Sequence, residues 1–200
     1  MAIETTHSEF EALLRQSASL HRHLCPRQVL GVRLGMCAAR RFAPLLPQKN
    51  KRMLAMVEMD GCFADGVSVA TGCSMGHRTM RLADEGKIAV TFIDTVIAAD
   101  ENSALRIYAL PDLRSRAADF ARGAPSRWHA YLSAYQHMAD EEMFGITPVR
   151  LNFDIRAVMG QPGVRTACSR CAEEILNLRE VVREGRILCR SCAGESYWSA

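Results

Sequence analysis

Four cysteines near the C-terminus constrain the fold of this chain more than any other feature. They form two C-x-x-C pairs separated by seventeen residues, Cys168 with Cys171 and Cys189 with Cys192. Two such pairs are typical of a structural zinc site, in which each pair forms a tight knuckle and all four thiolates bind one ion. Four free thiols, a thioredoxin-type redox pair and an iron–sulfur cluster are the alternatives. A zinc ion would supply folding free energy to a segment too small to fold on its own core.

The rest of the 200-residue chain is long enough for one main domain. The stretch GQPG at residues 160–163 has the composition of a linker, and the cysteine spacing changes after it. The sequence therefore predicts a core domain over residues 1–160. A small zinc-ribbon or treble-clef module is expected over residues 161–200.

Helical and strand patterns are mixed along the core segment. Thr6 and Glu9 have capping-box spacing at the first helix, and Pro26 suits the first position of the second. Helices are expected over residues 8–20, from 26 to the PLLP segment at 44–47, within 65–72, and over 111–122 and 125–144. Strands are expected over residues 53–59, 87–94, 105–110 and 150–159.

The helix that begins at Pro26 carries two packing signals. Cys37 falls on its apolar face and is expected to be a small core residue. Gly31 and Gly35 lie four residues apart, which would let another element approach the helix closely.

Hydropathy and charge exclude several classes of protein. No segment approaches the about 20 apolar residues that span a bilayer. The N-terminal residues lack a basic run followed by an apolar one, so no secretory signal and a cytoplasmic, reducing location are expected. In that location, eight cysteines are better explained as metal ligands or reactive thiols than as disulfides. The formal charge of +3 is small, and acidic residues offset the arginines around the knuckles, so nucleic-acid binding is not expected.

A second polar cluster, HRHLCP, occupies residues 21–26. If Pro26 is the first helical residue, Cys25 is the N-cap, where the helix dipole and unpaired N–H groups lower the pKa of a thiol. His21 and His23 can share one face only where the backbone is extended. The cluster therefore indicates either metal ligation or a nucleophile with its base, whereas histidines of this kind taken singly are usually surface residues.

A third cluster lies in the stretch DGCFADGVSVATGCSMGH, which begins at residue 60. It contributes Cys62, Asp65, Cys73 and His77, separated by glycines that permit turns. Imidazole with thiolate suits zinc, nickel, cobalt or iron. A glycine-rich loop with cysteines tucked beneath it is the structural alternative.

Residues 15–95 resemble the FmdE family of formylmethanofuran dehydrogenase proteins. HRHLCPRQVLGVRLG is similar to its H-G-H-x-C-P motif and the helix that follows. DGCFADGVSVATGCSMG is similar to its second signature, and GKIAVTF to the strand after it. Arg22 stands where the family motif commonly has glycine, and the C-terminal cysteine pairs fit a zinc-finger tail that many members carry.

The resemblance implies an α+β core, a homodimer and a metal-linked cleft. Carried over by position, the cleft would contain the residues of both motifs, which are His21, His23, Cys25, Cys62, Asp65 and Cys73. The expected metal ligands are His21, His23 and Cys62, with His23 and Cys62 foremost for direct contact. Cys25, Cys62 and Cys73 are candidate nucleophiles or sulfur carriers, and Asp65 is a candidate base or partner of a ligand.

Three functions remain open from the sequence. The first is a metal-binding protein that acts on or delivers a small molecule, or a sulfur or metal group. Its cofactors would be structural zinc in the tail and a second transition metal in the core cleft, with zinc preferred to nickel or iron. The second is a non-catalytic accessory or maturation subunit of a molybdenum or tungsten oxidoreductase, with that enzyme as partner. The third is a regulatory protein that binds a partner through its zinc finger.

Overall fold

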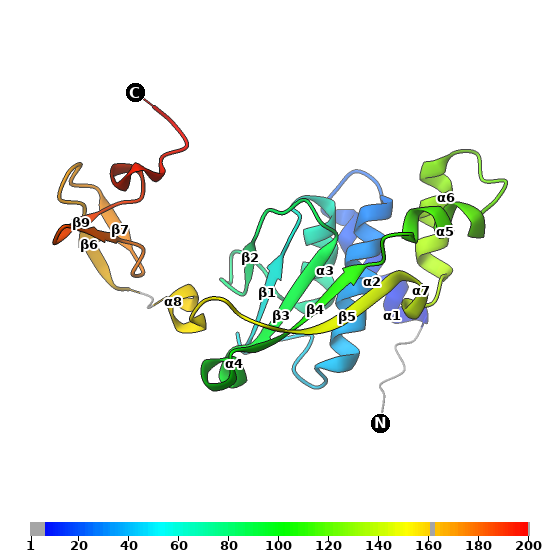
Figure 1. The fold of residues 1–200 in the computed structure, drawn as a ribbon. Coiled ribbons are helices and arrows are strands. Elements are labelled where there is room, and N and C mark those ends of the chain that lie inside the picture. Colours follow the sequence, from blue (N-terminus) through cyan, green and yellow to red (C-terminus); the bar gives the residue numbers. More distant parts are fainter. Residues whose placement is uncertain (1–6, 161–162, 200) are drawn as a thin grey trace. The chain divides into compact units, whose positions relative to one another are not determined.

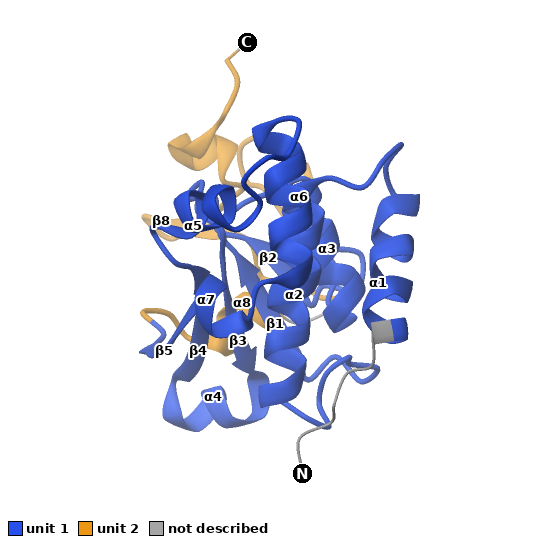
Figure 2. Cartoon of the chain, turned by 90° about the vertical axis from the view of Figure 1, so that its right-hand side faces the viewer, with its two compact units in different colours: residues 1–151 blue, residues 152–200 orange. Residues whose placement is uncertain are grey.

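The chain forms two compact units, residues 1–151 and residues 152–200 (Figure 2). The structure is a computed structural model and describes residues 7–160 and 163–199. Thr6, one residue of the expected capping pair, lies outside the described residues, and so do residues 161–162 of the expected linker.

A five-stranded mixed sheet forms the centre of the first unit (Figure 1). Its strands are β1 (Met53–Val57), β2 (Met80–Leu82), β3 (Ala89–Asp94), β4 (Ser103–Ala109) and β5 (Phe144–Arg150), in the spatial order β2-β1-β3-β4-β5. β1 and β2 are parallel, and the other neighbours are antiparallel. In β3, Ala89, Val90, Phe92 and Ile93 are fully buried and Thr91 is partly buried, so both faces of this central strand are covered.

Helices of the first unit cover one face of this sheet (Figures 1 and 2). The helices described in this unit are α1 (His7–Ser19), α2 (Pro26–Arg41), α3 (Cys62–Thr71), α4 (Thr95–Glu101), α5 (Leu113–Phe120), α6 (Arg127–His137) and α7 (Asp140–Met143). Of these, α4 lies at the ends of β3 and β4, which it connects, and does not cover the face. Buried apolar residues of α2 and α3, such as Val29, Val32 and Phe63, form one core cluster with residues of the sheet. The predicted α+β class is therefore confirmed.

α2 and α3 cross with their backbones in contact. A Cβ atom on Gly31 would lie 2.2 Å from the carbonyl oxygen of Phe63, and one on Gly66 would lie 2.4 Å from that of Gln28. The predicted close approach at Gly31 is confirmed, and its partner is α3. Cys37 is fully buried, as expected. Gly72 ends α3 at a φ of 69°, which confirms the predicted helix end at a residue tolerant of the left-handed region.

Two expected elements near the end of the first unit were wrong. The chain forms strand β5 over Phe144–Arg150, because these residues pair with β4 over its whole length. Of residues 150–159, only Arg150 consequently lies in a strand. The second half of this segment is the helix α8 (Ile155–Met159), whose N-cap Asp154 accepts a hydrogen bond from the N–H of Arg156. The helix expected over 125–144 is broken into α6 and α7 between residues 137 and 140. β2 and α4 were not expected from the sequence.

The second unit is built from α8 and two small hairpins. Strands β6 (Arg165–Ala167) and β7 (Glu174–Leu176) form one, and β8 (Val181–Arg183) and β9 (Arg186–Leu188) the other. A π-helical turn, η1 (Ser191–Glu195), follows. The buried cluster of this unit contains Cys168, Ile175, Leu188 and Ala193.

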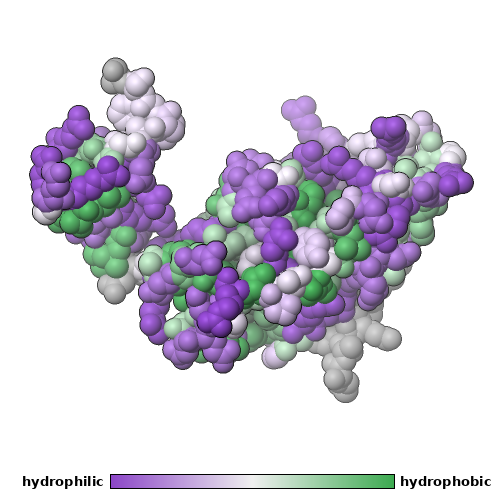
Figure 3. All heavy atoms as spheres, viewed as in Figure 1, coloured by the Kyte–Doolittle hydropathy of each residue, from purple (hydrophilic) through white to green (hydrophobic). Residues whose placement is uncertain are grey.

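None of the helices described over residues 7–160 and 163–199 is both long and apolar enough to cross a membrane. The view in Figure 3 shows a mainly hydrophilic surface on the first unit, with apolar side chains scattered over it. On the second unit, apolar side chains gather in one area of the face in view. Its exposed large apolar residues include Leu176, Leu178, Val182 and Ile187.

The ion pair between Arg52 and Asp94 should make the stability of the first unit depend on pH. Arg52 donates from Nε and Nη2 to the two Asp94 oxygens at 2.9 and 2.7 Å, and the N–H of Val96 donates to the same carboxylate at 3.1 Å. The hydrogen bonds from Arg52 hold the pKa of Asp94 below its ordinary value, although burial opposes this. The stabilisation is therefore complete above the unfolded-state pKa of about 4. It declines as the pH falls from there through the folded-state pKa.

We expect Asp94→Asn to lower the free energy of unfolding by about 1–3 kcal/mol at neutral pH, because it removes a charged acceptor from a buried site. The difference from the unmutated protein should shrink as the pH falls below about 4. Urea unfolding followed by circular dichroism at several pH values measures both effects. A difference that stays constant down to acid pH would contradict this origin of the stabilisation.

Candidate functional site

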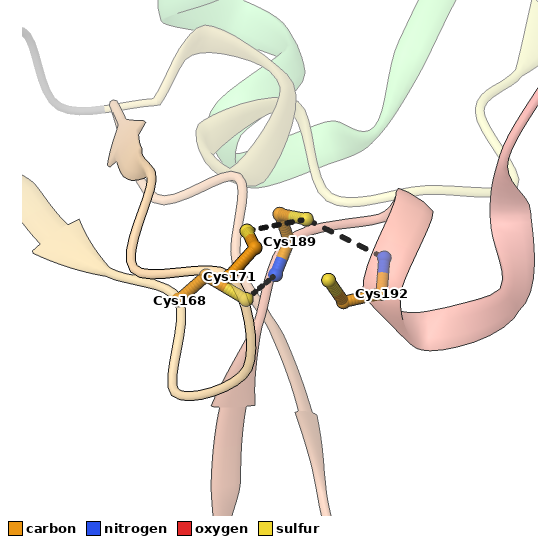
Figure 4. Close-up of side chains that lie close together, drawn as sticks. All are labelled: Cys168, Cys171, Cys189 and Cys192. Atoms are coloured by element: carbon orange, nitrogen blue, oxygen red, sulfur yellow. Dashed lines mark hydrogen bonds between the residues drawn. The ribbon is translucent and has the colours of Figure 1, made fainter. Parts of the chain in front are cut away.

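The four C-terminal cysteines converge on one point. Their sulfur atoms all lie within 4.8 Å of one another, and the Sγ atoms of Cys171 and Cys189 are 3.9 Å apart (Figure 4). The first pair lies in the turn between β6 and β7, and the second follows β9 and leads into η1. The predicted two-knuckle arrangement is thus present, and this group could hold a metal such as zinc.

Backbone N–H groups also point at these sulfurs. The N–H of Cys189 donates to Cys168 Sγ at 3.3 Å, that of Arg170 to the same sulfur at 3.5 Å, and that of Cys192 to Cys189 Sγ at 3.4 Å. Backbone hydrogen bonds from Cys171, Cys189 and Arg170 lower the pKa of Cys168 to about 6. Such donors favour the thiolate form that metal ions bind.

The first unit contains a cavity of about 690 Å³. It opens where α2 and α3 begin, beside the end of β4, α5 and one face of α6. Its lining residues are Cys25, Pro26, Arg27, Leu30, Cys62, Ile88, Ala109, Leu110, Pro111, Leu113, Arg114, Trp128, Tyr131 and Tyr135. Two of the cysteines expected in the cleft therefore line a single cavity.

Both cavity cysteines stand at helix starts. Cys25 is the N-cap of α2, as predicted, and its backbone N–H donates to Oε1 of Gln28 at 2.8 Å. The buried Gln28 side chain in turn donates to the carbonyl of Ser17, which ties α1 to the start of α2. Cys62 is the first residue of α3 and follows Gly61, whose φ of 66° suits glycine.

His21 connects Cys62 to Asp65. Its Nε2 lies 2.8 Å from Asp65 Oδ2, and its Nδ1 lies 3.9 Å from Cys62 Sγ. An ionised carboxylate can only accept, so in the neutral imidazole that fits this contact Nε2 carries the proton and Nδ1 presents a lone pair toward Cys62. Burial raises the pKa of the Cys62 thiol, and the hydrogen bond and charge of Cys25 and the charge of Asp65 raise it further.

The other expected site residues lie elsewhere. The structure exposes His23, whose ring centroid is 6.5 Å from that of Trp128. Cys73 is fully buried and does not line the cavity; Gln48 Nε2 donates to its sulfur at 3.0 Å. His77 is exposed and hydrogen-bonded to Ser74. Within residues 7–160 and 163–199, only the C-terminal cysteines form a group of three or more His, Cys, Asp or Glu residues whose metal-ligand atoms lie within 4.8 Å of one another.

Sequence reasoning missed the aromatic wall and the two arginines of the cavity. Trp128, Tyr131 and Tyr135 recur at helical spacing on α6, a pattern that equally fits a buried helix face. Arg27 and Arg114 come from α2 and α5, and nothing in the sequence relates them to each other. Packing of α6 against both α2 and α5 brings these five residues to one cavity.

A partly buried ion network anchors α6 to α2. Arg33 of α2 donates to the carbonyls of Tyr135, Gln136 and Met138 at 2.7 to 3.2 Å, and to Asp140 at 2.8 Å. Arg40 also pairs with Asp140. The arginine thus satisfies carbonyls at the C-terminal end of α6, where a cation is favoured.

The chain is similar to a family model, to a curated protein and to a solved structure. A family model described as "FmdE, Molybdenum formylmethanofuran dehydrogenase operon" matches residues 20–145. A probable S-adenosyl-L-methionine-binding protein of Archaeoglobus fulgidus is 35% identical over 89 residues, which are 43% of this chain and 24% of that protein. The chain thus matches about a quarter of the length of that relative.

The third comparison concerns a crystal structure. A tungsten formylmethanofuran dehydrogenase FmdE-like protein from Syntrophus aciditrophicus has a TM-score of 0.61 to this chain and 17% sequence identity, over 95% of both chains. At this level of identity, the likeness shows a shared fold.

Proposed function

Because this chain belongs to the FmdE family, we propose that it is a metal-binding protein whose core cavity holds a small molecule beside a metal-bound histidine and cysteine. It would act on that molecule or deliver it, or a sulfur or metal group, to another protein. The observation that carries this proposal is His21, placed between Cys62 and Asp65 beside the cavity that Cys62 lines.

The donor pair fits a transition metal. Bonds of about 2.1 Å from zinc to nitrogen and 2.3 Å from zinc to sulfur together exceed the 3.9 Å that separates His21 Nδ1 from Cys62 Sγ, so one ion can bind both atoms. Asp65 supports this role, because metal-bound histidines commonly donate their other N–H to a carboxylate. Zinc is the ion that we propose, with nickel or iron as alternatives.

A bound ion would supply Lewis acidity to a carbonyl or water in the cavity. The chain's own residues then have separate tasks. Asp65 holds the His21 ring in one tautomer and orientation. Cys25, hydrogen-bonded to Cys62, provides a second thiol in the cavity. The aromatic side chains of α6 exclude water from one side of the ligand.

We propose zinc in the C-terminal cluster as well, with a structural role. Four thiolates complete a tetrahedral shell, which leaves no position for a substrate. The two sites should therefore differ in lability, and the core ion, with only His21 and Cys62 as protein ligands, should be the easier to remove.

Metal analysis of the purified chain tests the core site. We expect two ions per chain in the unmutated protein and one in His21→Ala and in Cys62→Ser, because each variant removes one of two protein ligands. His77→Ala is the matched control, since that exposed histidine lies outside the cavity, and it should keep both ions. An unchanged metal content in His21→Ala and Cys62→Ser would overturn the proposed core site.

A further inference from the structure

The charged residues that line the core cavity are all positive. Arg27 and Arg114 line it, and no aspartate or glutamate does. Within the described part of the chain, neither arginine has a carboxylate partner, whereas Arg116 on the same helix as Arg114 pairs with Asp112. Arginines without carboxylate partners beside a concave surface are a common arrangement for binding carboxylate or phosphate groups.

Helix α6 supplies the aromatic side of the cavity. Trp128, Tyr131 and Tyr135 contribute an aromatic wall, and the last two rings are stacked with centroids 5.8 Å apart and planes 11° from parallel. Burial raises the pKa of Tyr135 to about 12, so its phenol adds no negative charge at neutral pH. Flat aromatic faces favour a ligand with a planar ring, since offset stacking adds to the apolar area buried.

The wall is also held in place before any ligand binds. Arg33 joins the carbonyls that end α6 to α2, the helix that carries Cys25 and Arg27. A site that needs little ordering on binding keeps more of its interaction free energy as affinity.

We propose that the cavity selects an anion with a planar ring, in which a carboxylate or phosphate pairs with Arg27 and Arg114 and the ring packs on the wall of α6. This inference rests on the proposed function, because it names the class of molecule held beside His21 and Cys62. It also separates this cavity from one built for S-adenosyl-L-methionine. That molecule carries a sulfonium and an ammonium, and the cavity lining offers no carboxylate to either cation.

Calorimetric titration of the full chain tests the ligand class with matched probes. The probes 2-naphthoate and 2-naphthyl phosphate share a ring and differ in the anion, 2-naphthol has the ring without a full charge, and hexanoate has a carboxylate without the ring. We expect at least one naphthyl anion to bind about tenfold or more tightly than 2-naphthol and hexanoate, as a charged hydrogen bond and ring burial imply. The stronger of the two anions identifies the acidic group.

Arg114→Gln should weaken binding of the preferred anion about tenfold and leave 2-naphthol unaffected. Arg116→Gln is the matched control, because Arg116 lies outside the cavity lining. This variant should bind the preferred anion and 2-naphthol as tightly as the unmutated protein does. Circular dichroism of each variant checks that the fold is retained.

Several results would overturn the proposal. They are binding of 2-naphthol as tight as that of the anions, tighter binding of S-adenosyl-L-methionine than of either anion, and no binding of either anion at about 1 mM. Repeating the titration with His21→Ala separates the two proposals. If the protein selects anions but holds no core metal, the proposed ligand class is supported and the core metal site is wrong. If it holds a core metal but does not select anions, the metal site is supported and the ligand class is wrong.

Discussion

Replacing Cys168 with serine should unfold the C-terminal unit while the first unit stays folded. Among the described residues of this unit, the buried cluster holds Ile175, Leu188 and Ala193 besides Cys168 itself, with the partly buried Val181 packed against it. Ordering a residue costs about 1–2 kcal/mol in backbone entropy, and so small an apolar core cannot offset that cost for the whole unit. Metal binding would therefore provide most of the folding free energy, which is about 10–16 kcal/mol for zinc-finger peptides at neutral pH.

The measurement is limited proteolysis of the full chain combined with circular dichroism. We expect rapid cleavage within residues 163–199 in Cys168→Ser, or in the unmutated protein treated with a strong chelator. The circular dichroism of the helices should change little, because all but α8 and η1 lie in the first unit.

Cys192→His is the matched variant for this experiment, since histidine is also a zinc ligand and should retain partial protection. Protease resistance of metal-free Cys168→Ser equal to that of the metal-loaded unmutated protein would show that the apolar residues suffice. The structural role of the ion would then be wrong.

Gly31→Ala should destabilise the first unit by more than about 3 kcal/mol, because backbone atoms must move to accept one methyl group. The added Cβ would lie 2.2 Å from Phe63 O and 3.0 Å from the Cα of Gly66. Both contacts are with backbone, so no side-chain rotation relieves them. Separation of α2 from α3 would also displace Cys25 from Cys62, which stand at the starts of these helices.

Other glycines provide a graded control for this prediction. A Cβ on Gly35 would lie 2.6 Å from Ala70 Cβ and 3.4 Å from Val67 O, which are longer distances than the 2.2 Å at Gly31, so Gly35→Ala should cost less than Gly31→Ala. A Cβ on Gly76 would meet nothing within 4 Å, and Gly76→Ala should change stability by no more than about 0.5 kcal/mol. Urea unfolding curves that show the same midpoint for Gly31→Ala as for Gly76→Ala would contradict the close crossing of α2 and α3.

Local signals accounted for most of the helices and for the cysteine cluster. Pro26 marked the start of α2, Gly72 marked the end of α3, and Gly31 indicated a close neighbour. The errors fell where pairing between distant residues decides the structure. Phe144–Arg150 is a strand because β4 lies beside it, and its apolar residues alone did not distinguish it from the end of α6.

The sequence by itself determined the C-terminal site. Each knuckle is made by residues three apart, and only strand β7 and the β8–β9 hairpin separate the two, so ligand spacing in the chain nearly dictates ligand spacing in space. The same reasoning placed Cys25 at a helix start, because a proline and an N-cap are neighbours in the chain.

Only the tertiary structure decided how the core cavity is composed. The family resemblance placed His23 ahead of His21 for direct metal contact, yet in the structure His21 contacts Asp65 and lies beside Cys62, while His23 is exposed. Cys73 and Cys62 also looked alike, but only Cys62 lines the cavity. The physical reason is that the cavity joins elements that are far apart in the chain, from α2 to α6. The alignment of these elements depends on helix packing and on the partly buried ion network of Arg33, Arg40 and Asp140. Neither feature has a local sequence pattern.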